Sequence, residues 1–180
     1  DKLYNLVSSK RFKLMSRRGR DLHIIKHIIF IARPTSSYQE NPDFVSGEIE
    51  HAICSAWQER RPDVMVIEGQ GSLMNPAYPG GFEILAAGRP DIIVLQHAPA
   101  RKEYDGFPGY ALHPLTRQIE VIELLSGKPV VAVTINHENI QPDAIDRVCQ
   151  QLRQKCARPT FDVLAHRVEP LVEALLPWLE

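Results

Sequence analysis

Residues 64–73 read Val-Met-Val-Ile-Glu-Gly-Gln-Gly-Ser-Leu, an apolar run that ends in a carboxylate followed by two nearby glycines. Near-continuous apolar character without alternation is typical of a strand covered on both faces, as in parallel sheets flanked by helices. A glycine directly after a strand lets the backbone approach a ligand closely. The stretch therefore predicts a buried strand over 64–67 with a site in the loop that follows.

Similar β-branched runs recur along the chain, and helical patterns separate them. The predicted strands are 24–31, 64–67, 92–95, 130–135 and 161–164. Apolar residues recur at helical spacing over 44–57, 115–125 and 145–152, and 169–179 is expected to form a terminal helix. Asp43 suits the cap of the first helix, and Pro142 suits the first turn of the third. This alternation predicts an α/β fold with a doubly wound, mostly parallel sheet flanked by helices.

The 180 residues, 44% of them hydrophobic, suffice for one domain with a sizeable core. We expect a single α/β domain over 1–180. Because the chain begins at Asp1 rather than Met, we expect it to be a fragment or a processed form of a longer protein.

Charge is distributed unevenly along the chain. Residues 1–27 hold eight basic and two acidic residues, whereas the remainder holds 13 basic and 20 acidic residues. An acidic main body argues against a nucleic-acid-binding face on that body. The basic segment is either a solvated arm, the commoner case, or a contact for phosphates of a nucleotide, a cofactor or RNA. Three cysteines cannot all pair, and no apolar run approaches the length of a membrane span. We therefore expect reduced thiols, no membrane partner and a cytoplasmic protein.

Open α/β sheets bind ligands beyond the carboxyl ends of their strands, and this rule selects three clusters of candidate residues. In the first, Glu68 could act as a general base or hold magnesium through water. The alternative is a structural turn in which Glu68 bonds to neighbouring backbone. The two long irregular stretches 69–81 and 97–114 follow strands, and loops of that length are usually functional or mobile.

The second cluster, 96–102, joins an imidazole to two cations. Arg101 is expected to grip a carboxylate or phosphate through two hydrogen bonds, with Lys102 as a second charge or as a solvated loop residue. His97 is either a catalyst or a structural hydrogen-bonding residue.

The third cluster, 136–139, places Asn136 where it could read a base or an amide, while Asn139 is expected to cap the helix near Pro142. His113, near Tyr110, is expected to pack within its loop.

Several familiar chemistries lack their motifs in this sequence. There is no HExxH or paired CxxC for a metal, no GxSxG for a serine hydrolase, and neither GxxxxGK[ST] nor GxGxxG for a nucleotide. No metal ligands are therefore assigned.

The stretch from Phe44 to about Leu179 resembles a bacterial family of P-loop-like proteins of unknown function that includes D-glutamate N-acetyltransferases. The resemblance rests on 43–50, on 68–73 together with 76–80, and on Pro90-Asp91 running to His97 and Arg101. The family is related to dethiobiotin synthetase, in which a strand-end Glu-Gly motif lies beside the nucleotide phosphates and a later asparagine reads the base. Typical members also carry an N-terminal Rossmann-like domain and a glycine-lysine phosphate loop, neither of which this chain shows. The resemblance therefore implies that the chain is a C-terminal domain of a longer protein.

The resemblance implies an enzyme with a P-loop NTPase-like fold that acetylates the amine of an acidic amino acid with acetyl-CoA. It assigns Glu68 or His97 as the base and Asn136 as the cofactor-binding residue. Expected substrate-binding residues are Gly69, Gln70, Gly71, Ser72, Tyr78, Arg101 and Lys102. The first alternative is an ATP- and magnesium-dependent ligase or kinase, and the second is a noncatalytic domain; self-association into a homo-oligomer is left open.

Overall fold

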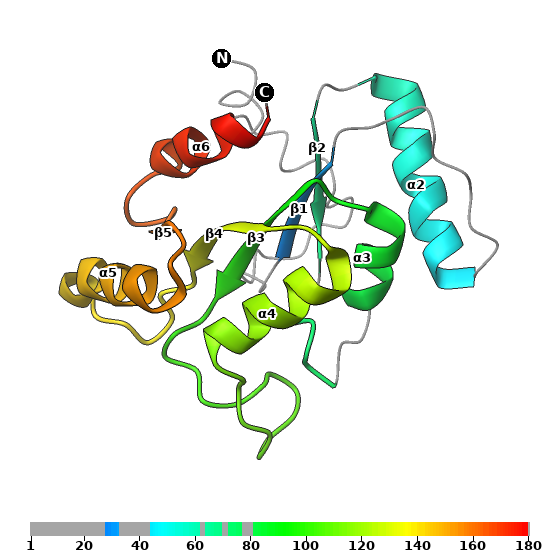
Figure 1. Cartoon of the computed structure of the whole chain (residues 1–180). Helices are drawn as coiled ribbons and strands as arrows, with labels where there is room; N and C mark the ends of the chain where they lie inside the picture. The colour runs from blue at the N-terminus through cyan, green and yellow to red at the C-terminus, as the bar shows by residue number, and fades with distance from the viewer. Residues whose placement is uncertain (1–27, 33–43, 62–63, 70–71, 77–80, 180) are drawn as a thin grey trace, which may run out of the picture.

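The computed structural model describes residues 28–32, 44–61, 64–69, 72–76 and 81–179 (Figure 1). Within these ranges the chain forms a central β-sheet with helices packed around it. No helix in the described part of the chain is both long and apolar enough to cross a membrane.

The sheet has five strands in the order β2-β1-β3-β4-β5. Its strands are β1 (Ile28–Ala32), β2 (Met65–Glu68), β3 (Ile92–His97), β4 (Val130–Ile135) and β5 (Thr160–Phe161). The pairs β3–β4 and β4–β5 are parallel, while β1 is antiparallel to both of its neighbours. Strand β2 therefore runs in the same direction as β3, β4 and β5, and the mostly parallel sheet is confirmed.

The first predicted strand differs from the expectation of parallel pairing. Strand β1 covers Ile28–Ala32 and is antiparallel, and residues 24–27 of the predicted strand lie outside the described residues. An apolar, β-branched composition indicates that a strand lies inside a sheet. Parallel and antiparallel strands inside a sheet can have the same composition. The composition could therefore predict that β1 exists but not its orientation.

The helices are longer or shorter than predicted at several ends. They are α2 (Phe44–Arg60), α3 (Gly81–Gly88), α4 (Leu115–Ser126), α5 (Ile145–Cys156) and α6 (Glu169–Leu175), with short 3₁₀ helices η2 (Pro142–Ala144) and η3 (Leu176–Trp178). Helix α3 was not predicted. Pro142 opens η2 at the start of α5 as expected, whereas Asp43 lies outside the described residues.

The last two elements are shorter than their patterns suggested. The predicted strand 161–164 is reduced to β5, because Asp162 already accepts turn hydrogen bonds from the backbone of Leu164 and Ala165. The predicted helix 169–179 divides into α6 and η3. Pro177 lacks the N–H that would continue the α-helical bonding, which accounts for the change to 3₁₀ geometry.

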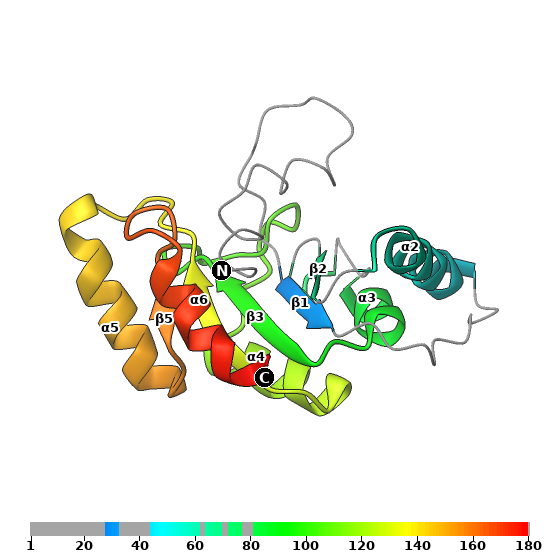
Figure 2. The ribbon, with the colours of Figure 1, turned by 90° about the horizontal axis from the view of Figure 1, so that it is seen from above.

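Both faces of the sheet are covered, as a doubly wound fold requires. Ile93, Leu95 and Val133 belong to a cluster that includes residues of α2, α3 and α4. Their neighbours Val94 and Ala132 pack with the opposite cluster, which includes residues of α6 (Figure 2). Alternate residues of each strand point to opposite faces, so the continuous apolar runs of β3 and β4 follow from having a core on each side.

Candidate functional site

The carboxyl ends of the parallel strands lie at one edge of the sheet. The β3–β4 register pairs His97 with Ile135, and the N–H of Asn136 donates to the carbonyl of His97 at 2.8 Å. Glu68 ends β2, which runs in the same direction, and lies level with Val94 across β1. The predicted common edge for Glu68, Gln96 and Asn136 is therefore confirmed. Because neighbouring strands are about 4.8 Å apart, Glu68 lies roughly 10 Å from β3.

Hydrogen bonds join the two long loops that follow β2 and β3. The Asn75 side-chain amide donates to the Asp105 carbonyl at 3.0 Å. The Ser72 hydroxyl donates to the Gln118 side chain at 3.3 Å, and the Gln118 amide donates to the His113 carbonyl at 2.7 Å. Ser72, a predicted substrate-binding residue, is thus tied to the start of α4, and the two loops form one structure at the sheet edge.

The loop after β3 folds around Tyr104, which the sequence analysis did not select. Tyr104 is 3% exposed and its hydroxyl lies 2.8 Å from Nδ1 of His113. Burial raises the pKa of the Tyr104 phenol, so the group stays a hydrogen-bond donor. Its ring lies 5.7 Å from that of Tyr110, which in turn contacts Phe107 edge-on. His113 therefore packs within its loop, as expected.

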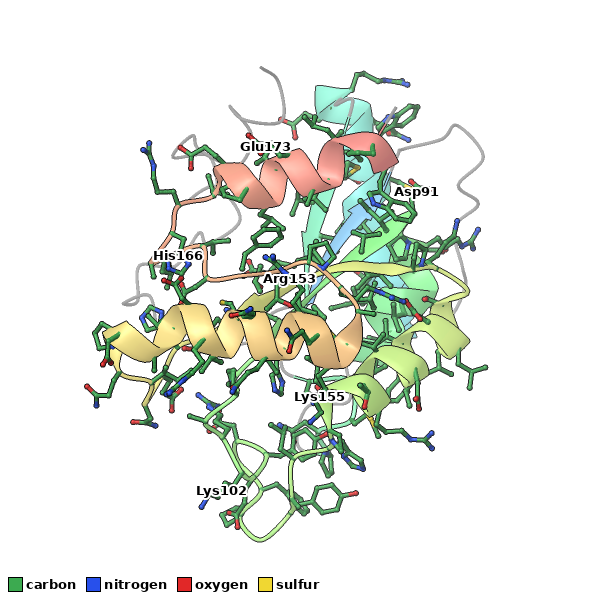
Figure 3. The ribbon with its side chains drawn as sticks, turned by 60° about the vertical axis from the view of Figure 1, so that its left-hand side comes forward. Asp91, Lys102, Arg153, Lys155, His166 and Glu173 are labelled. Carbon is green, nitrogen blue, oxygen red and sulfur yellow. The ribbon has the colours of Figure 1, made fainter. Side chains whose placement is uncertain are left out.

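Arg101 holds a carboxylate of the protein itself. Its Nε donates to Oε2 of Glu138 at 3.1 Å, and its Nη2 contacts the same oxygen. A looser ion pair to Asp105 measures 3.9 Å, and the Arg101 side chain is 20% exposed. The sequence predicted a carboxylate or phosphate partner for this guanidinium. In the structure the partner is a carboxylate of the chain itself, the side chain of Glu138. Lys102, by contrast, is exposed on the projecting loop (Figure 3).

The turn after β4 uses Asn136 in a structural role. The side-chain oxygen of Asn136, a buried residue, accepts the N–H of Glu138 at 3.0 Å. Asn139 takes a left-handed conformation with φ 60° and does not cap the next helix, whose N-cap is Gln141. The capping prediction for Asn139 was wrong because the residue instead turns the chain back, a conformation that asparagine tolerates better than most residues.

His97 lies at this edge with its side chain partly buried. Burial, and secondarily the charge of Lys155, lowers its pKa from 6.5 to about 4. The imidazole is therefore neutral at physiological pH and a weak proton acceptor.

A second imidazole at this edge is paired with a buried carboxylate. Nδ1 of His137, the residue after Asn136, lies 2.5 Å from Oδ2 of Asp162, which directly follows β5. The Asp162 side chain is 0% exposed, whereas that of His137 is 37% exposed. The sequence analysis included His137 only as part of the cluster 136–139, without a role, and missed Asp162. A carboxylate immediately after a short apolar strand was the available signal.

The structure describes only some of the predicted substrate-binding residues. Gln70, Gly71 and Tyr78 lie outside the described residues, as does the basic segment 1–27. Gly69 is buried beside the exposed Glu68. Among the described residues, no group of three histidine, cysteine, aspartate or glutamate side chains is arranged to hold a metal ion.

The chain matches the model of a known protein family. The P-loop domain of DUF1611, described as a domain of unknown function (DUF1611_C), matches residues 41–172. The chain belongs to the DUF1611 family. The resemblance noted from residues 43–101 is thereby confirmed.

Two curated relatives of this DUF1611 domain are named D-glutamate N-acetyltransferase. One, from a Pseudoalteromonas species, is 29% identical over 140 residues, and the other, from Tritonibacter scottomollicae, is 26% identical over 139 residues. Each match covers 74% of this chain and 41% of the relative, so the chain spans about two fifths of their length. The crystal structure of a DUF1611 protein from Anabaena variabilis is similar with a TM-score of 0.69 and 22% identity. That match covers 76% of this chain and 41% of the other.

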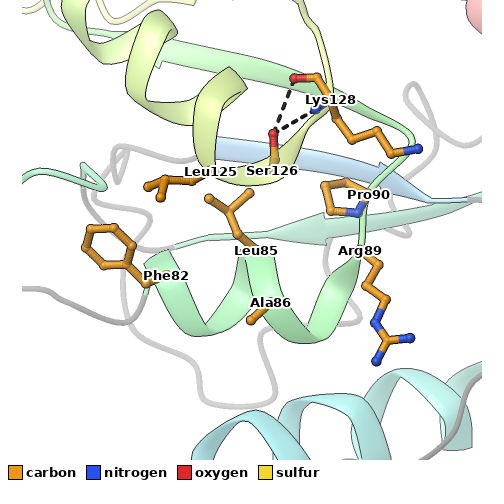
Figure 4. Close-up of a pocket in the computed structure, with 8 residues that line it drawn as sticks. All are labelled: Phe82, Leu85, Ala86, Arg89, Pro90, Leu125, Ser126 and Lys128. Atoms are coloured by element: carbon orange, nitrogen blue, oxygen red, sulfur yellow. Dashed lines mark hydrogen bonds between the residues drawn. The ribbon is translucent and has the colours of Figure 1, made fainter.

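A cavity of about 310 Å³ lies between α3 and α4, at the opposite edge of the DUF1611 domain's sheet (Figure 4). Phe82, Leu85 and Leu125 form its apolar wall, and Arg89 and Lys128 line it where the chain enters β3 and β4. It is therefore separate from the loops that carry Arg101 and His137. The strand-end rule favours those loops over the cavity.

Proposed function

We propose that the chain is part of an N-acetyltransferase that moves the acetyl group of acetyl-CoA to the amine of an acidic amino acid. D-glutamate is the first substrate to test, because two relatives carry that activity in their names. In α/β folds small ligands bind beyond the carboxyl ends of the strands, which is the edge where Arg101 and His137 lie.

The observation that carries the proposal is the pairing of Arg101 with a carboxylate at the carboxyl-end edge. Two guanidinium nitrogens converge on one carboxylate oxygen of Glu138, which supports a role for Arg101 in carboxylate binding. Because Glu138 is exposed, a substrate carboxylate can exchange with it at little cost in buried charge. Arginine is suited to this exchange, since its fork recognises carboxylates through paired hydrogen bonds.

Acetyl transfer also needs a base for the ammonium proton and donors for the oxyanion of the tetrahedral intermediate. Of the two bases suggested by the sequence, His97 is the weaker candidate because burial lowers its pKa to about 4. Glu68 is exposed at the end of β2 and keeps the required access. The N–H groups of 69–72 stay the predicted oxyanion donors, although residues 70 and 71 lie outside the described part of the chain.

The test is release of the coenzyme A thiol by the full-length protein, with D-glutamate, L-glutamate and D-glutamine as acceptors. D-glutamine has the same shape but lacks the side-chain carboxylate. We expect D-glutamate to exceed D-glutamine by at least roughly 100-fold in kcat/KM, since a site built for a polar partner rejects analogues that lack it. Thiol release that does not depend on any amino acid would contradict the proposal.

The P-loop description of the family favours a second candidate, an ATP- and magnesium-dependent ligase or kinase. Magnesium at such sites is held by one or two carboxylates together with substrate phosphates, and Glu68 could supply one carboxylate. Magnesium-dependent ATP turnover in the presence of an acidic amino acid, without coenzyme A release, would favour this candidate.

A further inference from the structure

The His137–Asp162 pair has a hydrogen-bonding arrangement that fixes the state of the imidazole. Asp162 Oδ1 accepts the backbone N–H groups of Leu164 at 3.0 Å and Ala165 at 2.9 Å. Oδ2 remains for His137 Nδ1 at 2.5 Å. Because these two bonds fix the carboxylate in place, Oδ2 stays directed at Nδ1 and accepts its N–H. The carboxylate therefore fixes the orientation of the imidazole ring.

In the neutral form of the ring, the proton is on Nδ1 and the lone pair on Nε2, because an ionised carboxylate can only accept. Among the described residues, Nε2 of His137 makes no hydrogen bond, and the side chain is 37% exposed. A buried carboxylate behind an accessible imidazole is the arrangement by which enzymes present a histidine as a general base.

The pair also lies next to the proposed carboxylate site. Arg101 is bonded to Glu138, and Glu138 directly follows His137 in the chain, so their Cα atoms are about 3.8 Å apart. Glu68 is three strand positions away from β4, roughly 14 Å across the sheet. If Arg101 binds the carboxylate of an amino acid, the amine of that amino acid is therefore closer to His137 than to Glu68.

We propose that His137 is the base of the acetyl transfer and that Asp162 is its positioning residue, an inference that rests on the proposed function. Nε2 takes one proton from the substrate ammonium, and the freed nitrogen pair attacks the thioester carbonyl. Collapse of the intermediate breaks the C–S bond and expels the coenzyme A thiolate, which takes the proton from the imidazolium. The second amine proton leaves to solvent as the amide forms.

Further titratable groups lie around the pair, namely Asp146, His166 and Cys149. Asp146 pairs with His166 at 3.0 Å, and His166 lies in the segment between α5 and α6 (Figure 3). The thiol of Cys149 lies close to Asp162, and burial followed by the charges of Asp162 and Asp146 raises the pKa of that thiol. The thiol is thus kept protonated and does not compete as a nucleophile.

The experiment compares His137→Gln and Asp162→Asn with the control His166→Gln in the full-length protein, using acetyl-CoA and D-glutamate. His137→Gln should lower kcat by roughly 10²- to 10⁴-fold with little change in KM, because the amide cannot accept the proton. His166→Gln should retain wild-type kcat. Added imidazole should partly restore the activity of His137→Ala, which a merely structural role would not allow.

Asp162→Asn tests the positioning role directly. The asparagine oxygen can still accept the two backbone N–H groups, while its amide faces Nδ1 and moves the ring proton to Nε2. Nitrogen NMR of the ring above about pH 8 should show a protonated Nδ1 in the wild type and a protonated Nε2 in the variant.

The outcomes separate the two proposals. A wild-type protein without D-glutamate-dependent thiol release overturns the proposed function. An active wild type in which folded His137→Gln keeps its kcat, or in which Glu68→Gln alone loses it, overturns the assignment of His137. If the substituted proteins do not fold, a wild-type ring protonated on Nε2 overturns it.

Discussion

Arg101 holds the Glu138 carboxylate through two of its guanidinium nitrogens. In Arg101→Lys the charge stays but the fork that reaches Glu138 through Nε and Nη2 is lost. If a substrate carboxylate exchanges with Glu138, KM for D-glutamate should rise about tenfold, with a smaller effect on kcat. Steady-state kinetics measure both constants.

Two further variants make this prediction specific. Arg117→Lys is a matched control, because Arg117 forms an exposed pair with Glu120 on α4 and should leave KM unchanged. Glu138→Gln should lower KM, since the internal competitor for the guanidinium is weakened. Equal KM values in wild type and Arg101→Lys would remove Arg101 from the substrate site.

His97 makes stability depend on pH. Its folded pKa is about 4 against an ordinary 6.5, so between these values the unfolded chain binds more protons than the folded one. The free energy of unfolding should therefore be highest above pH 6.5 and fall as the pH decreases toward 4, by at most about 3 kcal/mol from this group. Urea denaturation at several pH values measures it.

The same titration in His97→Gln should have a shallower slope between pH 4 and 6.5, because the glutamine does not titrate. Parallel curves for wild type and His97→Gln would show that His97 does not contribute.

Residue choices from sequence succeeded where local chemistry was sufficient. A guanidinium just after a strand is close to other strand ends in any such sheet, and so Arg101 was found. Asp162 and Tyr104 were missed because their importance lies in partners 25 and 9 residues away. Asn139 was misassigned because capping and left-handed turns favour the same side chain.

At the scale of elements, Arg158, which lies between α5 and β5, joins α4 to β4. Its Nε donates to the Val130 carbonyl at 2.8 Å and its Nη2 to Glu123 at 3.1 Å, and Glu123 also accepts the N–H of Val130. These bonds hold the end of α4 to the start of β4. Arg158→Ala should lower the free energy of unfolding by about 1–3 kcal/mol, since partly buried acceptors lose a charged donor.

The exposed Arg117 pair again provides the comparison for this stability measurement. Arg117→Ala should change the free energy of unfolding by less than about 0.5 kcal/mol, because surface ion pairs are weak. Chemical denaturation of both variants at one pH measures the difference. A cost for Arg158→Ala no larger than that for Arg117→Ala would show that the junction is not held by this side chain.

Elements were predictable to the extent that their apolar pattern was complete. The continuous apolar run of β4 gave its bounds, and β3 extends two residues past its run because Gln96 and His97 still pair with β4. Helix α3 was missed since its short sequence, Gly-Phe-Glu-Ile-Leu-Ala-Ala-Gly, is flanked by glycines that resemble loop signals.

At the scale of the whole molecule, three hypotheses differ in the ligand that should stabilise the protein. They are an acetyltransferase, an ATP-dependent ligase or kinase, and a noncatalytic domain. A ligand that binds only the native state at 100 times its dissociation constant adds about 2.7 kcal/mol to the free energy of unfolding. For a domain of this size each kcal/mol raises Tm by roughly 2–4 °C, so the expected shift is about 5–10 °C.

We expect acetyl-CoA to raise the Tm of the full-length protein by this amount, and D-glutamate to add a further rise that Arg101→Lys reduces and Arg117→Lys does not. A shift with ATP and magnesium but not with acetyl-CoA would favour the ligase or kinase reading, and Glu68→Gln should then weaken it if Glu68 organises the metal. No shift with any of these ligands at millimolar concentration would favour a noncatalytic domain. Arg101→Lys keeps the positive charge and removes only the guanidinium fork. Its comparison with the wild type therefore distinguishes recognition of a carboxylate from general attraction of an anion.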